Sequence, residues 1–153
     1  MQIVLYEPEI PPNTGNVARL CAATDTELHL IEPLGFSIDD KHLKRAGLDY
    51  WPHVRVSVWP DFEAYRAGPG QGRRLVLTSA RRGVSVGRFG FRPDDVLVFG
   101  PETRGLPEEV MAVSDLHVRI PIWGAVRSLN LSTAVGIVLY QAFIASGVLD
   151  EHA

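Results

Sequence analysis

With 153 residues and a net charge of −3, the chain is long enough for one domain with a buried core. This charge argues against a protein that coats nucleic acid, although it leaves room for a local basic face. No apolar run reaches the roughly 18 residues of a membrane span, and no basic region precedes the strand-like start, as a signal peptide requires. Cys21 is the only cysteine, which excludes an internal disulfide and a cysteine-rich metal site. We therefore expect a cytoplasmic protein without a metal.

Short apolar runs bounded by turn residues predict the strands. They cover residues 2–6, 28–31, 54–58, 75–78, 96–99 and 116–120. Apolar spacing and capping residues predict the helices. These cover residues 13–24, 39–47, 61–66, 107–113 and 130–147. The Gly- and Arg-rich segment 80–95 is expected to be irregular. Strands that alternate with helices indicate an α/β fold, with a mainly parallel sheet and helices on both of its faces.

The last predicted helix, entered near Asn130, is apolar on nearly every side. Such a helix is usually buried all round, and in so small a chain this suggests that a second chain covers part of it. Just before it, the backbone around Ser128 and Leu129 leads into a helix start, where free N–H groups can hold a ligand.

Three segments follow predicted strand ends, where open α/β sheets bind their ligands. They read NTGNVAR, FGPETRGL and IPIWGAVRSLNLS. Each polar residue in them also has an ordinary explanation. Asn13 can cap the first helix, and Ser128 and Asn130 can cap the last one. Arg19 can lie on a solvated helix face, and Glu102 can pair with Arg104. Gly100 and Gly105 can be ordinary turn glycines. Neither a dinucleotide-binding nor a P-loop pattern is present.

Taken together, the three segments resemble motifs one, two and three of the SPOUT methyltransferases of the TrmH type. The runs LYEPEIPPNTGN, IEPLGF and KRAGLDY resemble in particular the small members of this family that act on nucleotide 34 of tRNA. The resemblance covers almost the whole chain.

The resemblance implies an RNA ribose 2′-O-methyltransferase that uses S-adenosylmethionine. Its substrate would be the anticodon loop of tRNA, with leucine tRNA as the first candidate, modified at the wobble cytidine or 5-modified uridine. It also implies a homodimer and a C-terminal trefoil knot, whereas general rules favour an un-knotted chain. We expect residues 1–153 to form a single methyltransferase domain without a separate RNA-binding domain.

The family motifs also assign site residues. Those expected at the cofactor are Leu77, Thr78, Gly100, Ile120, Ser128 and Leu129. Arg19 and Asn13 match the catalytic pair of motif one. Because a guanidinium stays protonated, we expect Arg19 to clamp an RNA phosphate or stabilise an alkoxide while Asn13 positions the hydroxyl. Glu102 and Asn130 match further motif positions, and Glu102 would brace its loop or pair across the dimer.

Two basic clusters are candidates for RNA contact. One contains Lys41, Lys44 and Arg45, and the other contains Arg81 and Arg82, followed by Arg88 and Arg92 with Phe89 and Phe91 interleaved. Arginines with exposed aromatic rings suit phosphate contact and base stacking, but a solvated loop with core phenylalanines fits equally well.

The segment 123–126, Trp-Gly-Ala-Val, is less polar than in some relatives, which bears on the shape of the cofactor loop and on nucleotide preference. Two other functions remain open: methylation at another tRNA or rRNA site, and RNA binding without catalysis.

Overall fold

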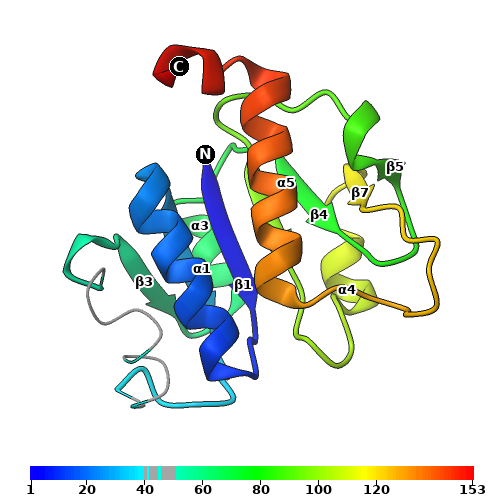
Figure 1. Cartoon of the computed structure of the whole chain (residues 1–153). Helices are drawn as coiled ribbons and strands as arrows, with labels where there is room; N and C mark the ends of the chain where they lie inside the picture. Colours follow the sequence, from blue (N-terminus) through cyan, green and yellow to red (C-terminus); the bar gives the residue numbers. More distant parts are fainter. Residues whose placement is uncertain (40, 42–44, 46–50) are drawn as a thin grey trace.

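The structure of the protein, a computed structural model, describes residues 1–39, 41, 45 and 51–153 (Figure 1). Within these residues a seven-stranded sheet has the order β3-β2-β1-β6-β4-β7-β5, and its strand pairs are parallel. The strands are β1 (Gln2–Tyr6), β2 (Glu27–Ile31), β3 (Val56–Trp59), β4 (Leu75–Thr78), β5 (Val84–Ser85), β6 (Val96–Phe99) and β7 (His117–Arg119). The helices are α1 (Pro11–Thr24), α3 (Phe62–Ala67), α4 (Glu108–Met111) and α5 (Leu131–Ser146), with 3-10 turns η1 (Trp51–His53), η2 (Val86–Arg88) and η3 (Leu149–His152).

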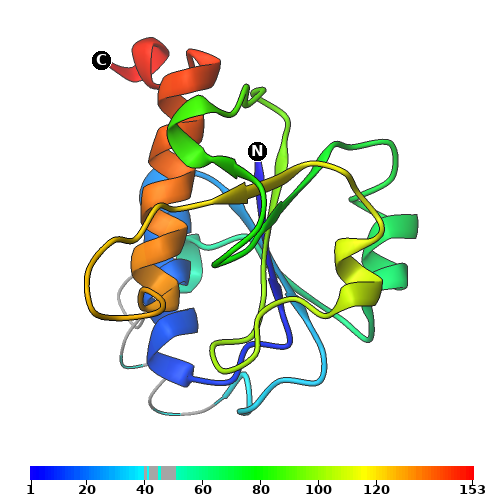
Figure 2. The same ribbon diagram turned by 90° about the vertical axis from the view of Figure 1, so that its right-hand side faces the viewer.

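Helices cover both faces of the sheet, as expected from the sequence. Figures 1 and 2 show α1 and α5 side by side on one face and α3 and α4 on the other. Side chains alternate between the two cores along each strand. In β1, Ile3 and Leu5 belong to the core with α1 and α5, whereas Val4 belongs to the core with α3 and α4. Because both faces are covered, the strands read as continuous apolar runs.

Some boundaries differ from the expected ones. The first helix begins at Pro11, so Asn13 lies inside its first turn and does not cap it. Prolines suit the first turn because the N–H groups that they lack have no helical partner there. Strand β3 begins two residues later than expected, and the segment expected to be irregular contains β5 and η2. Most of the helix expected at 39–47 lies outside the described residues.

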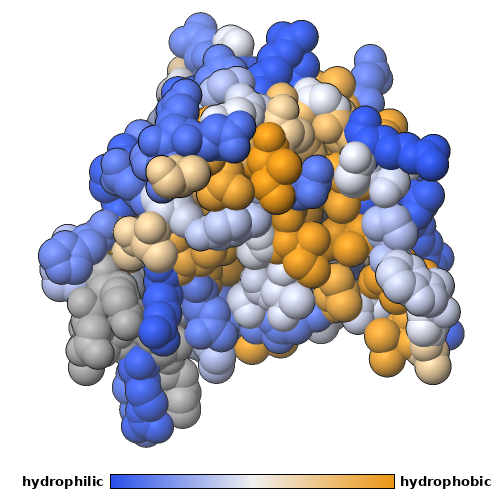
Figure 3. All heavy atoms as spheres, turned by 45° about the horizontal axis from the view of Figure 1, so that its top comes forward, coloured by the Kyte–Doolittle hydropathy of each residue, from blue (hydrophilic) through white to orange (hydrophobic). Residues whose placement is uncertain are grey.

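The last helix begins after Asn130 and ends at Gly147, as expected. The single chain does not bury this helix on all sides, because Ile137, Tyr140 and Ile144 are 39%, 43% and 56% exposed; that a second chain covers part of it stays a prediction. Figure 3 shows an apolar area on the face of the molecule that carries α1 and α5. None of the described helices has the length and apolar character needed to cross a membrane.

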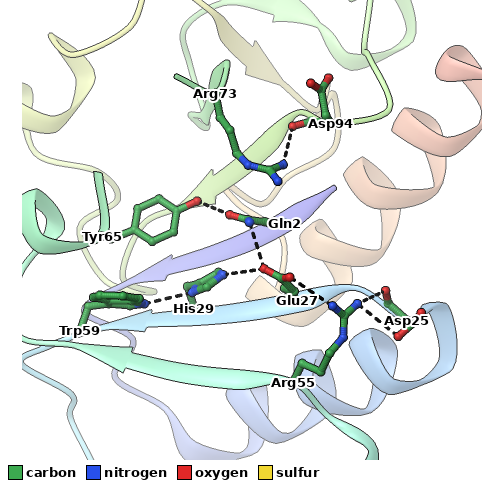
Figure 4. A network of polar contacts seen from close by, with 9 residues as sticks. All are labelled: Gln2, Asp25, Glu27, His29, Arg55, Trp59, Tyr65, Arg73 and Asp94. Carbon is green, nitrogen blue, oxygen red and sulfur yellow. Dashed lines mark hydrogen bonds and ion pairs between the residues drawn. The ribbon is translucent and has the colours of Figure 1, made fainter. Parts of the chain in front are cut away.

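A polar network lies on the face of the sheet that α3 covers (Figure 4). At its centre, Nδ1 of the buried His29 accepts a hydrogen bond from Trp59 Nε1 at 3.0 Å, and its Nε2 lies 3.2 Å from Glu27. Because an indole N–H can only donate, the proton of the imidazole must be on Nε2. Glu27 also accepts from Gln2, whose side-chain oxygen accepts from the Tyr65 hydroxyl at 2.5 Å. The network therefore holds His29 in its neutral form.

Unfolding should depend on pH through this histidine. Burial lowers the pKa of His29 below its ordinary 6.5, and the hydrogen bond to Glu27 opposes this only in part. The unfolded chain then binds a proton more readily than the native one. We expect the free energy of unfolding to fall as the pH drops below about 6.5, as measured by urea titrations on either side of that value. His29→Gln should flatten the dependence, and His152→Gln, in the exposed η3 turn, should leave it unchanged. An equal slope in wild type and His29→Gln would contradict this assignment.

Candidate active site

A pocket of about 860 Å³ opens at the carboxyl ends of β4, β6 and β7. Its wall is formed mainly by segments 78–82, 99–106, 118–120 and 127–131, and Ile10 and Asn13 close one side. The volume falls within the range of about 300–1,000 Å³ that is usual for small-molecule sites. The three loops that the sequence singled out, far apart along the chain, therefore meet around one pocket.

Most of the residues expected at a cofactor line this pocket. They are Thr78, Gly100, Ile120, Ser128 and Leu129. Leu77 does not line it, because its side chain is fully buried in the core under α3 and α4. Of the two expected catalytic residues, Asn13 lines the pocket and Arg19 does not.

The difference between these two residues follows from helix geometry. Arg19 is exposed on α1, six residues beyond Asn13. Six helical residues correspond to about 9 Å along the axis and about 240° around it. The two side chains therefore leave α1 on different sides, and Arg19 does not share the pocket of its own chain with Asn13.

Asn13 is joined to Asn130 across two of the loops. Asn130 caps α5, since its Oδ1 accepts from Ser132 N at 2.9 Å and from Thr133 N at 3.4 Å. Its Nδ2 is then left to donate to Asn13 Oδ1, at 2.9 Å. Because Asn13 uses its oxygen here, its own Nδ2, which has no partner in the described part of the chain, can donate into the pocket. The start of α5 was expected to offer free N–H groups to a ligand. This is wrong for the backbone N–H groups of Ser132 and Thr133, because both donate to the side chain of Asn130.

Two glutamates bind the start of α1 to the loop after β6. Glu102 accepts hydrogen bonds from the backbone N–H groups of Glu9, at 3.2 Å, and Ile10, at 2.5 Å. In return, Glu9 accepts from the backbone N–H and the hydroxyl of Thr103, at 3.0 and 2.7 Å. These bonds lower the pKa of the Glu9 carboxyl. The reciprocal contact fixes the position of Asn13 relative to the pocket wall.

The alternative that Glu102 pairs with Arg104 is wrong, since Arg104 pairs with Glu7 at 3.1 Å. The contacts of Glu102 support its role as a brace. Glu7 and Glu9 were not singled out from the sequence, because no spacing marks them. Their signal in the sequence was their position in the run LYEPEIPPNTGN, next to the prolines that open α1.

Gly100 lies where the loop after β6 turns back on itself. A Cβ at this position would come within 2.3 Å of Leu106 N and 2.4 Å of Gly105 C. Gly105 has a φ of 67°, and its N–H donates to Pro101 O at 2.9 Å. This part of the pocket wall is therefore backbone packed on backbone.

The arginine-rich segment exposes its arginines but not its phenylalanines. Arg81 and Arg82 both line the pocket, but Arg82 forms an ion pair with Glu108, which lowers the pKa of that carboxyl. The ring centroids of Phe89 and Phe91 lie 4.7 Å apart, with Phe91 buried in the core and the partly buried Phe89 packed against it. The expectation that they are exposed stacking surfaces is wrong, and the core alternative is right.

The other basic cluster is away from the pocket lining. Lys41 and Arg45 are exposed and line no part of the pocket, and Lys44 lies outside the described residues.

A smaller cavity of about 440 Å³ lies near the amino end of β4. Two of its arginines, Arg66 and Arg74, already pair with Glu63 and Asp95, and ligands of parallel sheets bind at the opposite edge. The residues that the structure describes include no group of three or more His, Cys, Asp or Glu side chains that could hold a metal ion.

Comparison with known proteins identifies the family. The chain matches the SpoU rRNA Methylase family over residues 1–140. It is 50% identical over 143 residues to a tRNA (cytidine(34)-2′-O)-methyltransferase of Methylovorus glucosotrophus, with 92% of each chain covered. A solved structure that concerns the 2-OH methylation of C/U34 on tRNA is 51% identical, with a TM-score of 0.90 and 94% of each chain covered. An AdoMet-bound rRNA methyltransferase from Sinorhizobium meliloti is 25% identical, with a TM-score of 0.85 over 94% of this chain and 55% of that one. The match over nearly the whole sequence confirms the resemblance drawn from the three motifs, and the chain belongs to the SpoU rRNA methylase family.

Proposed function

We propose that the protein transfers a methyl group from S-adenosylmethionine to the ribose 2′-hydroxyl of the wobble nucleotide, cytidine or 5-modified uridine 34, of tRNA. The observation that carries this proposal is the meeting of the three motif loops around one pocket at the carboxyl ends of β4, β6 and β7. The substrate is supported by the tRNA (cytidine(34)-2′-O)-methyltransferase that is 50% identical over 92% of the chain. Leucine tRNA is the first isoacceptor to test.

The pocket suits the cofactor in size and in the character of its wall. Gly100, Ser128 and Leu129 line it, and fixed backbone dipoles at such positions can orient a ligand that carries both a cation and a carboxylate. A relative with the same fold binds AdoMet. When bound, S-adenosylmethionine supplies the methyl group and a sulfonium leaving group. Thr78 and Ile120 complete the lining, and Leu77 supports Thr78 from the core.

The chain's own residues align the ribose oxygen and assist the loss of its proton. Asn13 donates from Nδ2 to the ribose hydroxyl oxygen, which leaves a lone pair of that oxygen directed at the methyl group. Asn130 holds Asn13 in this orientation, and Glu102 holds the start of α1 in place. Arg19, permanently charged, clamps an RNA phosphate outside the pocket of its own chain. The proton passes to a phosphate oxygen or to water.

Four further features belong to the same proposal. The exposed apolar residues of α5, Ile137, Tyr140 and Ile144, support a homodimer in which a second copy covers them. The insertion of β7 between β4 and β5 supports a chain tied as a trefoil knot. Residues 1–153 act as one methyltransferase domain, which itself contacts the anticodon loop. The enzyme works in the cytoplasm, where its tRNA substrate is found.

Basic side chains of the two clusters supply the remaining RNA contacts in this proposal. Arg81 is exposed on the pocket rim, Lys41 and Arg45 are exposed elsewhere on the surface, and Lys44 is included on the sequence pattern alone. Arg82 takes part by releasing Glu108, with which it pairs in the free protein.

The test is methyl transfer from labelled S-adenosylmethionine to tRNA that lacks this modification, with the labelled nucleotide mapped. Wild type should label the wobble ribose, and Arg19→Ala should lower kcat/KM by roughly 10- to 100-fold, since a hydrogen bond to a charged group such as the RNA phosphate contributes about 1.5–3 kcal/mol. Arg66→Ala, on the opposite side of the sheet and paired with Glu63, is the matched control. Label in rRNA or at another tRNA nucleotide would show that the enzyme methylates a different site. Binding of RNA without any methyl transfer would show that the protein binds RNA but is not an enzyme.

A variant of Asn130 separates its capping role from its role at Asn13. Aspartate caps helices as well as asparagine does, but both of its oxygens accept, so Asn130→Asp cannot donate to Asn13. We expect urea stability within about 1 kcal/mol of wild type and a loss of roughly 10-fold or more in methyl transfer. Asn16→Asp adds the same charge at an exposed position of α1 and should have a small effect. Full activity of Asn130→Asp would refute the role of this hydrogen bond.

A further inference from the structure

The loop between β7 and α5 carries an aromatic ring that the fold does not use. Trp123 is 92% exposed, and Val126, three residues later, is 66% exposed. Single apolar residues are common on protein surfaces, but tryptophan is among the most buried residue types on average. Folding of this chain thus leaves nearly the whole indole in water.

The position of this ring relates it to the pocket. Ile122 and Arg127, on either side of the loop tip, line the pocket, whereas Trp123 itself does not. The ring therefore lies at the rim, outside the volume assigned to the cofactor. Residues 121–129 make no backbone–backbone hydrogen bond with the described residues, so the tip is held at its ends and can adjust to a ligand.

The charges at the same rim favour a polyanion. Arg81, Arg119 and Arg127 line the pocket and have no ion pair with any acidic residue that the structure describes. By contrast, Arg82 and Arg104, in the same wall, are paired with glutamates. Unpaired arginines beside an exposed aromatic ring are the combination that binds single-stranded nucleic acid, in which arginine contacts phosphate and the ring stacks on a base.

Other aromatic rings are poorly placed for this task. Phe89 and Phe91 pack into the core, and Tyr140, on α5, makes an edge contact with Phe143 at 5.6 Å. Among the described aromatic residues, Trp123 alone is exposed next to the pocket lining. Its ring is also apart from the contacts that hold Asn13 and Glu102.

We propose that Trp123 is a stacking platform for a base next to the methylated nucleotide. This inference rests on the proposed function. When the target ribose enters the pocket, a neighbouring base is pulled out of the stacked bases of the anticodon loop. The face of the Trp123 indole then stacks on this base and replaces the contact that it has lost. Arg127 and Arg81 hold the phosphates on either side. The contact adds affinity without reading sequence, because every base has a flat face.

The experiment compares Trp123→Ala, Trp123→Phe and Trp123→Leu with wild type, using unmodified leucine tRNA and its isolated anticodon stem-loop. Loss of one stacked base should raise the Kd for RNA about 5- to 150-fold in the alanine variant. Phenylalanine should recover most of the affinity and leucine should not, while the Kd for S-adenosylmethionine stays within about twofold of wild type. The difference in emission between wild type and Trp123→Phe isolates this indole from Trp51 and Trp59, and the stem-loop should quench it.

Several outcomes would overturn the proposal. Wild-type RNA affinity in Trp123→Ala, or recovery by leucine, would exclude stacking. A change in Trp123 emission with S-adenosylmethionine alone would assign the ring to the cofactor, and a change on dilution without ligand would assign it to contact with a second copy. Methyl transfer by the wild type is measured in parallel. If the wild type labels no tRNA, the proposed function is wrong. If wild type and Trp123→Ala label tRNA equally and have the same Kd for RNA, only the role proposed for Trp123 is wrong.

Discussion

Replacing Gly100 by alanine should abolish measurable cofactor binding and lower the free energy of unfolding by roughly 3 kcal/mol, the upper end for an overpacked site. The new Cβ would come within 2.3 Å of Leu106 N and within 2.8 Å of Gly105 Cα. Both are backbone atoms, so no side chain can rotate away, and the loop itself must shift. Since residues 99–106 form one wall of the pocket, the shift deforms the cofactor site. Calorimetric titration with S-adenosylmethionine and urea unfolding measure the two effects.

Gly87→Ala is the matched control for Gly100→Ala. A Cβ at Gly87 would meet no atom within 4 Å, and its φ is not in the left-handed region. Such a substitution usually stabilises by about 0.4–1 kcal/mol, because it restricts the unfolded chain. If Gly100→Ala bound the cofactor as tightly as Gly87→Ala, the backbone contact at Gly100 would not be what shapes the pocket.

Glu102→Gln should reduce methyl transfer by about 10- to 100-fold while the protein remains folded. A glutamine oxygen in the place of Oε2 can still accept from both Glu9 N and Ile10 N, but the substitution removes the negative charge and places an amide N–H group against Glu9 N where Oε1 now accepts. The contacts to Glu9 and Ile10 are charge-assisted hydrogen bonds, and weakening them should cost about 2 kcal/mol of unfolding free energy. The start of α1 then moves relative to the pocket wall, and Asn13 moves with it. Single-turnover transfer at saturating tRNA and urea unfolding measure these effects.

Glu109→Gln removes the same charge nearby, at an exposed position in the first turn of α4. We expect its transfer rate to stay within about twofold of wild type, because exposed helix-end charges contribute only about 0.3–1 kcal/mol. A rate in Glu102→Gln equal to that of Glu109→Gln would show that the brace is unnecessary.

The fold and the location of the site could be predicted from the sequence, because both depend on short-range patterns. Apolar runs such as 96–99 fix the strands, and parallel strands bring their carboxyl ends to one edge of the sheet. For this reason the loops after Thr78, Phe99 and Arg119 meet at one pocket. The alternation of strands and helices predicted that loops after strand ends meet at one edge, whereas the place of Thr78 in the site was predicted from the family resemblance.

The contacts within the site could not be predicted in the same way. The hydrogen bond between Asn13 and Asn130 joins residues 117 positions apart and depends on how α1 and α5 are rotated about their axes. The side of α1 on which Arg19 lies depends on the same rotation. The placement of Phe89 and Phe91 stayed open between core and surface because the Gly-rich segment around them has no regular period, so the sequence does not show which side of it faces the core.

The place of β7 in the sheet has a consequence for synthesis on the ribosome. Within the sheet β5 pairs only with β7, which is made later, so β5 cannot join the sheet when it leaves the exit tunnel. The pocket also lacks the walls formed by residues 118–120 and 127–131 until most of the chain has been translated. We therefore expect the nascent protein to be unable to bind cofactor while it is still being made, and premature release before α5 should leave a product with no active site.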